Sequence, residues 1–321
     1  MVYPNINCLY FCYWMLNISW QTLTPTRLAL ITAVYNASLN GTSVTTIQFN
    51  NFTQVTAWRR PYFQVWVDNN GSPPLESFQY FKYWSTQPSS TFKGYIDTFI
   101  NTLKSTNDWQ YLKAVWLLGV PTLDGAVINM CAPWVTQATL ISTPTFTANQ
   151  GYGGFSATKA INLQFTLGLG NTLNQNYAEF GAYSRTNSAE DGIDIGSANT
   201  ASAQKNEIWA KWTDNKIYAS IGGSAITGTT VSNSKQLFTI KRTNSANLQA
   251  LQQGVSIVTT NSAPTGISLF SLYLGASNVA NTITKPTTRQ YALAYVADPQ
   301  LNSLNFATAV QALGTSIGWQ V

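Results

Sequence analysis

The sequence contains no histidine, little cysteine and few charged residues. Of its 321 residues, 9% are charged and three are cysteine. Without histidine, this chain can form neither a Ser-His-Asp nor a Cys-His catalytic site, and no histidine can ligate a metal. The cysteines, Cys8, Cys12 and Cys131, are too few for a disulfide framework, and their odd number leaves at least one thiol free. Assembly in a reducing cytoplasm is the simpler interpretation.

Long hydrophobic runs are also absent. The longest, residues 8–16, is far shorter than the roughly 20 residues that a membrane span requires. It lacks the basic flank and the small-residue cleavage site of a signal peptide. We therefore predict no membrane span, and we expect this run to pack against the protein itself or against a partner.

Basic residues are scattered along the chain, although the net charge is +5. The densest points are the pairs Arg59-Arg60 and Lys241-Arg242. A nucleic acid interface needs lysines and arginines clustered on one face. We therefore predict no nucleic acid partner and interpret both pairs as solvated strand ends.

The chain is instead rich in aromatic, threonine and asparagine residues, with 13% aromatic and 45% hydrophobic residues. β-branched and aromatic side chains suit a pleated, half-buried surface, and asparagine suits turns. Strand-like runs alternate with Gly, Asn and Asp clusters and not with helices, which predicts a mainly β chain folded as an antiparallel sandwich. The predicted strands are 114–120, 126–130, 138–142, 161–167, 180–185, 207–212, 216–221, 236–242, 248–251, 255–259, 268–274 and 291–296.

A few short helices are predicted to flank these strands. Apolar residues at three- and four-residue spacing form one helical face, namely Phe92, Ile96, Phe99, Ile100 and Leu103. A second helix is predicted to be capped by Ser303 and to stop at Gly314. The dipeptide Asp214-Asn215 predicts the turn of a hairpin.

Two domains are predicted, with a boundary near residue 90. Residues 1–90 contain short strand-like runs with Asn-Gly turns, which are typical of a small β-rich module for attachment or assembly. Residues 91–321 are predicted to form the sandwich. Prolines and serines between residues 71 and 90 break regular structure and supply a linker.

Several local patterns follow one another between residues 92 and 321. They are Gly94-Tyr95-Ile96-Asp97, Gly151-Tyr152-Gly153-Gly154, Ile193-Asp194-Ile195-Gly196, Phe238-Thr239-Ile240-Lys241 and Leu272-Tyr273-Leu274-Gly275. In this order they resemble the concanavalin A-like, laminin-G-like domains found in tail and other virion proteins of tailed phages. The resemblance implies a jelly-roll sandwich and a place in the virion, assembled in the host cytoplasm. It does not extend to residues 1–90, for which attachment to other virion proteins of the capsid or tail is a hypothesis.

Carboxylates are the remaining catalytic candidates. Glucanases that share this fold hold them close together on one strand, because one attacks or activates while another donates a proton. Residues 192–196 retain Asp194 but carry glycines where flanking acids would be needed, and Glu190 and Asp191 lie in a Ser- and Gly-rich loop. We predict that the chain is not an enzyme and uses no cofactor. Its aspartates, including Asp214, are spread too thinly to predict a calcium site.

Aromatic residues are the candidates for binding. A sugar face can stack on an aromatic ring, while a guanidinium or an amide supplies hydrogen bonds. The glycan contacts that we predict are Tyr152, Tyr183, Arg185, Asn187, Trp209 and Trp212, with Phe155 as a further stacking candidate. For any single ring, packing in the core is the commoner outcome. Side chains alternate along a strand, so Trp209 and Trp212 should not share a strand face, and at least one should be exposed.

Three functions fit these observations. The main prediction is a structural protein of a phage particle, such as a capsid decoration or a tail appendage. It would form a homo-oligomer and touch host surface glycans. The alternative is a secreted carbohydrate-binding or glycan-hydrolysing protein of the same fold. The third is an assembly cement without a ligand, in which the N-terminal module contacts neighbouring subunits.

Overall fold

The computed structural model describes residues 75–134, 137–168, 173–199 and 204–319. The predicted N-terminal β module, with Cys8, Cys12 and the pair Arg59-Arg60, lies outside the described residues, apart from its last part from residue 75 onward. Contacts divide the chain into two compact units, residues 1–73 and 74–321. All the described helices and strands belong to the second unit.

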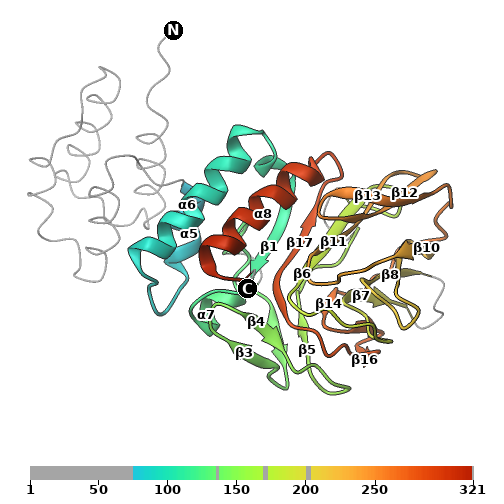
Figure 1. The fold of residues 1–321 in the computed structure, drawn as a ribbon, viewed down its shortest axis with the longest axis horizontal. Helices are drawn as coiled ribbons and strands as arrows, with labels where there is room; N and C mark the ends of the chain where they lie inside the picture. The colour runs from blue at the N-terminus through green and yellow to red at the C-terminus, as the bar shows by residue number, and fades with distance from the viewer. Residues whose placement is uncertain (1–74, 135–136, 169–172, 200–203, 320–321) are drawn as a thin grey trace, which may run out of the picture. The chain divides into compact units, whose positions relative to one another are not determined.

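Two sheets form the sandwich that the sequence predicts (Figure 1). Within the described residues, the first sheet has eight strands in the order β13-β12-β11-β6-β17-β4-β3, with β1 paired to β17. All its pairings are antiparallel. Its strands are β1 (Leu112–Leu117), β3 (Thr145–Thr147), β4 (Gly151–Gly153), β6 (Ala178–Ser184), β11 (Leu237–Asn244), β12 (Asn247–Gln252), β13 (Val255–Thr260) and β17 (Tyr291–Ala297).

The second sheet has nine strands among the described residues, in the order β10-β9-β8-β7-β14-β5-β2. The hairpin of β15 and β16 joins it through β15, which pairs with β7 in parallel. Its other pairings are antiparallel. The strands are β2 (Thr139–Ile141), β5 (Ala160–Asn162), β7 (Ile195–Ala198), β8 (Lys205–Trp209), β9 (Lys216–Ile221), β10 (Ser224–Thr230), β14 (Tyr273–Leu274), β15 (Ser277–Val279) and β16 (Thr282–Thr284).

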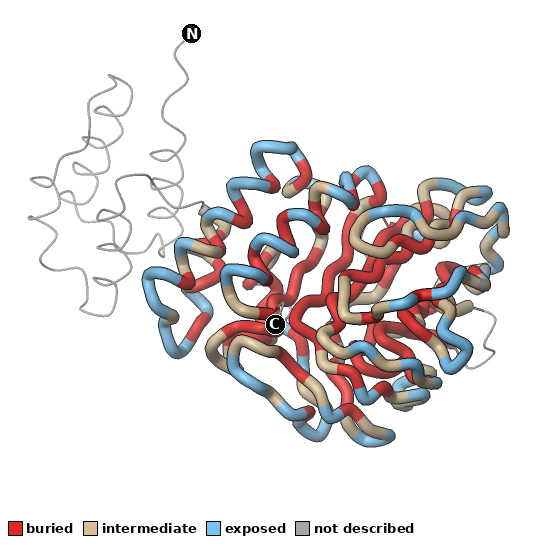
Figure 2. Tube along the Cα trace, in the orientation of Figure 1, coloured by how far each residue is buried: buried red, intermediate tan, exposed pale blue. Residues whose placement is uncertain are grey.

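The central strands of the first sheet are covered on both faces (Figure 2). All seven residues of β6 and all seven of β17 are buried, so neither strand shows the alternation of a half-exposed one. One face looks toward the second sheet, while α6 (Ser90–Ser105) and α8 (Ser303–Ile317) lie side by side against the other (Figure 1). The ring of Phe306 in α8 joins these layers, with its centroid 4.4 Å from that of Tyr295 and 6.3 Å from that of Phe99.

The predicted helices form, with different ends. The apolar face predicted for α6 is confirmed, because its five residues are all buried. The predicted stop of α8 at Gly314 is wrong: this glycine is buried inside the helix, and the chain turns left-handed only at Gly318, with φ of 95°. The predicted cap, Ser303, is also wrong: the cap is Asn302, one residue earlier, whose side chain accepts hydrogen bonds from two backbone amides. In the described part of the chain, no helix has the length and apolarity to cross a bilayer.

A further helix, α5 (Leu75–Lys82), precedes the predicted boundary near residue 90. Tyr80 and Phe81 of this helix are buried, and so is Trp84 just after it. Phe81 and Trp84 pack against Phe92 of α6, with ring centroids 6.4 and 5.8 Å away. These contacts make α5 part of the same hydrophobic core as the sandwich.

One predicted strand is wrong, and the predicted hairpin is confirmed. Residues 126–130 are not a strand, because α7 (Leu123–Ala126) ends there and Asn129 forms a single bridge with Trp116. The hairpin at Asp214-Asn215 joins β8 to β9, which pair antiparallel. Asn215 adopts the left-handed conformation, with φ of 64°, that such turns need and that asparagine tolerates.

The pair Lys241-Arg242 is not a solvated strand end. Arg242 is fully buried and donates to backbone carbonyls, and the Lys241 ammonium lies 3.2 Å from a carboxylate oxygen of Glu179. Glu179 also accepts hydrogen bonds from the hydroxyls of Tyr295 and Ser303. Burial raises the pKa of Glu179, and Lys241 only partly opposes the shift. These contacts join β6, β11, β17 and the start of α8.

The packing of Phe306 predicts a large effect on stability. Substitution Phe306→Ala should lower the free energy of unfolding by about 3–5 kcal/mol, because it leaves a cavity between α8 and the sheet. The matched control is Leu304→Ala in the same helix, where the side chain is 52% exposed, and the change should stay within about 0.5 kcal/mol. Urea denaturation measures the free energy of unfolding of both variants. Equal losses would show that Phe306 does not hold α8 against the sheet.

Candidate functional site

An aromatic cluster lies where the β8–β9 hairpin turns. It consists of Trp209, Trp212 and Tyr218, all half-buried. The rings of Trp209 and Trp212 are stacked, with centroids 5.9 Å apart and planes 10° from parallel. Tyr218, which lies opposite Trp209 in the register of the two strands, packs edge-on against Trp212 at 4.7 Å. We call these three residues the aromatic cluster.

The expectation that Trp209 and Trp212 cannot share a face is wrong. The alternation of side chains holds only while the chain remains a strand, and β8 ends at Trp209. Trp212 stands in the following turn, where its amide donates to the carbonyl of Lys216. The turn brings its ring back over Trp209, so the two half-buried tryptophans lie together at the hairpin.

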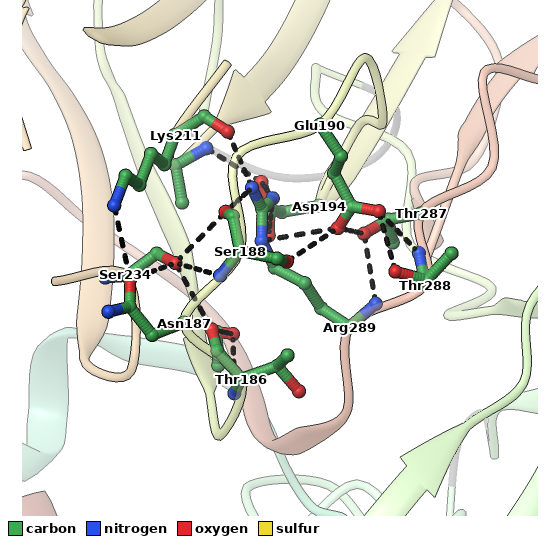
Figure 3. Close-up of polar contacts among 12 residues, drawn as sticks. Thr186, Asn187, Ser188, Glu190, Asp194, Lys211, Ser234, Thr287, Thr288 and Arg289 are labelled. Atoms are coloured by element: carbon green, nitrogen blue, oxygen red, sulfur yellow. Dashed lines mark hydrogen bonds and ion pairs between the residues drawn. The ribbon is translucent and has the colours of Figure 1, made fainter. Parts of the chain in front are cut away.

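Figure 3 shows a buried ionic network around Arg289. Nη1 of Arg289 lies 2.9 and 2.8 Å from the two carboxylate oxygens of Asp194. Its Nε lies 3.3 Å from Glu190, as an ion pair without a hydrogen bond. The side chain of Arg289 is fully buried and that of Asp194 is 2% exposed. A buried charge is tolerated only when it is paired and hydrogen-bonded, and here both conditions are met.

This network fixes the backbone between the two tryptophans. The amide of Ala210 donates to Asp194 at 2.6 Å, and Nη2 of Arg289 donates to the carbonyl of Lys211 at 2.6 Å. Ala210 and Lys211 are the two residues that separate Trp209 from Trp212. The stacked arrangement of Trp209 and Trp212 is therefore fixed by the buried ion pair of Arg289 and Asp194.

Glu190 extends the network toward the segment after β16. It accepts hydrogen bonds from the hydroxyl of Thr287 at 2.5 Å and from the amide and hydroxyl of Thr288 at 2.9 and 2.7 Å. Burial alone would raise the pKa of Glu190, but these hydrogen bonds and the charge of Arg289 outweigh it and lower the pKa. Glu190 therefore stays ionised and ties the 190–194 loop to residues 287–289.

Charged side chains surround the aromatic cluster. The ammonium of Lys285 lies over the ring of Trp212, 5.2 Å from its centroid, and 2.9 Å from the carboxylate of Asp191. The hydroxyl of Tyr218 donates to Asp214 at 2.8 Å. This bond lowers the pKa of Asp214 and raises that of Tyr218. The site thus combines flat apolar rings with hydrogen-bonding groups at their edges.

Two of the predicted contact residues lie in the core. Tyr152 is fully buried beside Phe146, and Tyr183 is 2% exposed beside Trp319. Phe155, the further stacking candidate, is 6% exposed. None of these rings offers a surface to a ligand, because all three are buried among other side chains.

Arg185 and Asn187 are engaged in internal contacts. Nε of Arg185 donates to the carbonyl of Trp319 at 2.8 Å, and Nη1 donates to Gln290 at 2.9 Å. Oδ1 of Asn187 accepts from the ammonium of Lys211 at 3.3 Å and from the amide of Ser234 at 3.0 Å (Figure 3). Of the six predicted contacts, only Trp209 and Trp212 come together in the cluster.

Sequence reasoning missed Tyr218 and Lys285. Tyr218 could have been found from the turn at Asp214-Asn215, because that turn sets which residues of the hairpin lie opposite Trp209. No local pattern points to Lys285, which reaches Trp212 from a segment more than seventy residues further along the chain.

Cys131 and the carboxylates offer no metal centre in the described ranges. No group of three His, Cys, Asp or Glu residues lies close enough together there to hold an ion. Cys131 is a free, half-buried thiol, and burial raises its pKa. Asp194, the carboxylate that the sequence offered for catalysis, is enclosed by Arg289 and by the hydroxyl of Tyr291 at 2.6 Å.

Comparisons with known proteins give similarity in fold. No protein-family model and no curated protein matches the sequence. Trypanosoma rangeli sialidase is 10% identical over 67% of this chain and 38% of its own, with a TM-score of 0.43. Domain 4 of AbnA, a GH43 extracellular arabinanase from Geobacillus stearothermophilus, is 10% identical over 62% of this chain and 98% of its own, at 0.42. The CBM40 of Ruminococcus gnavus IT-sialidase is 10% identical over 42% and 83%, at 0.33.

The match to the sialidase covers well under half of that protein, since this chain spans 38% of its length. These comparisons nevertheless contradict one prediction made from the sequence, namely that the chain is not an enzyme. Structures with a similar fold include a sialidase and a domain of an arabinanase.

The enclosure of Asp194 predicts a structural role for it. Substitution Asp194→Asn should lower the free energy of unfolding by about 3–5 kcal/mol, because it leaves Arg289 buried without its main partner. In the control Asp191→Asn, the side chain is 51% exposed, and the loss should stay below about 1 kcal/mol. Thermal and urea unfolding measure the difference. A stable Asp194→Asn variant would show that the network does not hold the fold.

Proposed function

We propose that this chain binds carbohydrate through the aromatic cluster. The observation that carries the proposal is the stacked pair of half-buried tryptophans, Trp209 and Trp212, at one hairpin. A sugar ring has apolar C–H faces and a polar edge of hydroxyls. Flat aromatic rings bordered by a few hydrogen-bonding groups match both parts of it.

The rigidity of the cluster supports binding. The backbone between the tryptophans is held by Asp194 and Arg289, at 2.6 Å in each case. Rings that are already ordered lose little conformational freedom when a ligand arrives, so less of the interaction energy is cancelled. A fixed surface therefore strengthens a weak contact, such as one sugar stacked on one indole.

The groups at the edge of the cluster suit hydroxyls. Asp191 and Asp214 offer carboxylate oxygens that accept hydrogen bonds, and Lys285 offers a donor. Both carboxylates already have a partner in Lys285 or Tyr218. The edge is therefore polar without a large net charge, as recognition of hydroxyls requires.

For the setting, we propose a tailed-phage particle, in which the sandwich is carried on the capsid or a tail appendage and self-associates as a homo-oligomer. The support is the ordered series of motifs between residues 92 and 321 that resembles concanavalin A-like virion domains. Attachment would fall to residues 1–73, the compact unit that precedes the sandwich.

Binding can be tested on a glycan array with the full chain. Substitution Trp212→Ala should reduce binding about tenfold or more, the loss expected when an aromatic anchor is truncated. The matched control is Trp134→Ala, which removes a tryptophan that is 55% exposed and outside the cluster, and binding should be unchanged. Equal binding by the unmodified chain and both variants would show that the aromatic cluster does not bind the glycan. Release of reducing sugar in the same samples reports hydrolysis.

The particle setting has its own test. Mass spectrometry of purified particles should detect the chain, and a chain without residues 1–73 should fold but fail to be incorporated. The deletion ends before α5, because Tyr80, Phe81 and Trp84 belong to the core of the sandwich. Particles that lack the chain would contradict the virion setting and leave carbohydrate binding to be judged by the array.

A further inference from the structure

Lys285 is held in a strained position beside the aromatic cluster. It follows β16 directly and adopts the left-handed conformation, with φ of 47°. A lysine pays a steric cost there that glycine would not, and such outliers persist only where the surroundings enforce them. Its carbonyl is fixed by the amide of Ile193 at 2.9 Å.

The side chain of Lys285 is held by two surface contacts. Its ammonium lies over Trp212, 5.2 Å from the ring centroid, and 2.9 Å from Asp191. The lysine side chain is 44% exposed and the aspartate side chain 51%. Exposed contacts of both kinds are weak. The ammonium can therefore leave the ring without disturbing the fold.

The place that Lys285 occupies is one that a sugar would use. Trp209 is stacked on Trp212 and Tyr218 packs edge-on against the same ring. The ammonium lies over a face of this ring. A pyranose and an ammonium cannot stack at the same position, so binding there requires the lysine to move.

We propose that Lys285 caps Trp212 in the free protein, and that a neutral, hydroxyl-rich sugar displaces it. This inference rests on the proposed carbohydrate binding by the cluster. When the ammonium leaves, Asp191 loses its partner and accepts a hydrogen bond from a sugar hydroxyl instead. The cap makes Lys285 a determinant of affinity that opposes binding.

The charges around the cluster select the class of sugar. Displacement of Lys285 leaves Asp191 unpaired, whereas Asp214 keeps the hydroxyl of Tyr218 at 2.8 Å and the ammonium of Lys216 at 3.8 Å. The unpaired carboxylate of Asp191 accepts a hydrogen bond from a hydroxyl but repels a sugar that carries a carboxylate. Neutral sugars are therefore expected to bind better than sialylated ones.

The test compares the full chain with Lys285→Ala. Maltotriose, cellotriose and N-acetylchitotriose are the neutral probes, sialyllactose is the acidic probe, and calorimetry measures the dissociation constants. Lys285→Ala should bind a neutral probe about two- to fivefold more tightly, the gain expected when one exposed cation–π contact no longer competes. Alanine keeps the strained backbone position, so only the side chain differs.

The control is Lys93→Ala, which removes the same charge from a lysine lying 5.6 Å from the ring centroid of Phe81, outside the cluster. Its affinities should equal those of the unmodified chain. Weaker or unchanged binding by Lys285→Ala would overturn the cap, and weaker binding of sialyllactose alone would make Lys285 a contact for acidic sugars. If no probe binds either protein, both the cap and the proposed binding through the cluster are overturned. If Trp212→Ala abolishes binding while Lys285→Ala leaves it unchanged, only the cap is overturned.

Discussion

The fully buried guanidinium of Arg289 is the group on which the arrangement of this protein's surface site depends. It pairs with Asp194 through two close contacts and donates to the carbonyl of Lys211. Through Asp194 it also holds the amide of Ala210. A charge so deep in the sandwich is stable only if its partners stay in place, so the loops that supply them cannot move independently.

The same principle applies to other charged residues in the interior. Arg289, Glu179 and Arg242 are fully buried, and Lys241 pairs with Glu179 beneath α8. Their partners include backbone carbonyls as well as acids, so each charge orders several segments at once. Since only 9% of the residues are charged, the surface is built largely from uncharged polar residues.

The sequence predicts the layers of this fold better than the site. Periodicity along Phe92 to Leu103 identifies α6, and the turn residues Asp214-Asn215 identify the β8–β9 hairpin, because both signals are local. The alternation rule fails at Trp212 because the strand ends three residues earlier, a boundary that the tryptophans themselves do not mark. Lys285 and Arg289 reach the site from a distant part of the chain, and such long-range contacts have no signature in a single sequence.

The position of β17 in the first sheet has a consequence for how the protein is made. This strand, Tyr291–Ala297, lies between β6 and β4 and also pairs with β1, yet it follows all three of these strands in the sequence. During synthesis its neighbours emerge first and wait with open hydrogen-bonding edges and uncovered apolar faces. The first sheet therefore closes only after residues 291–297 have been synthesised, and a ribosome stalled shortly before residue 291 holds a chain prone to aggregate.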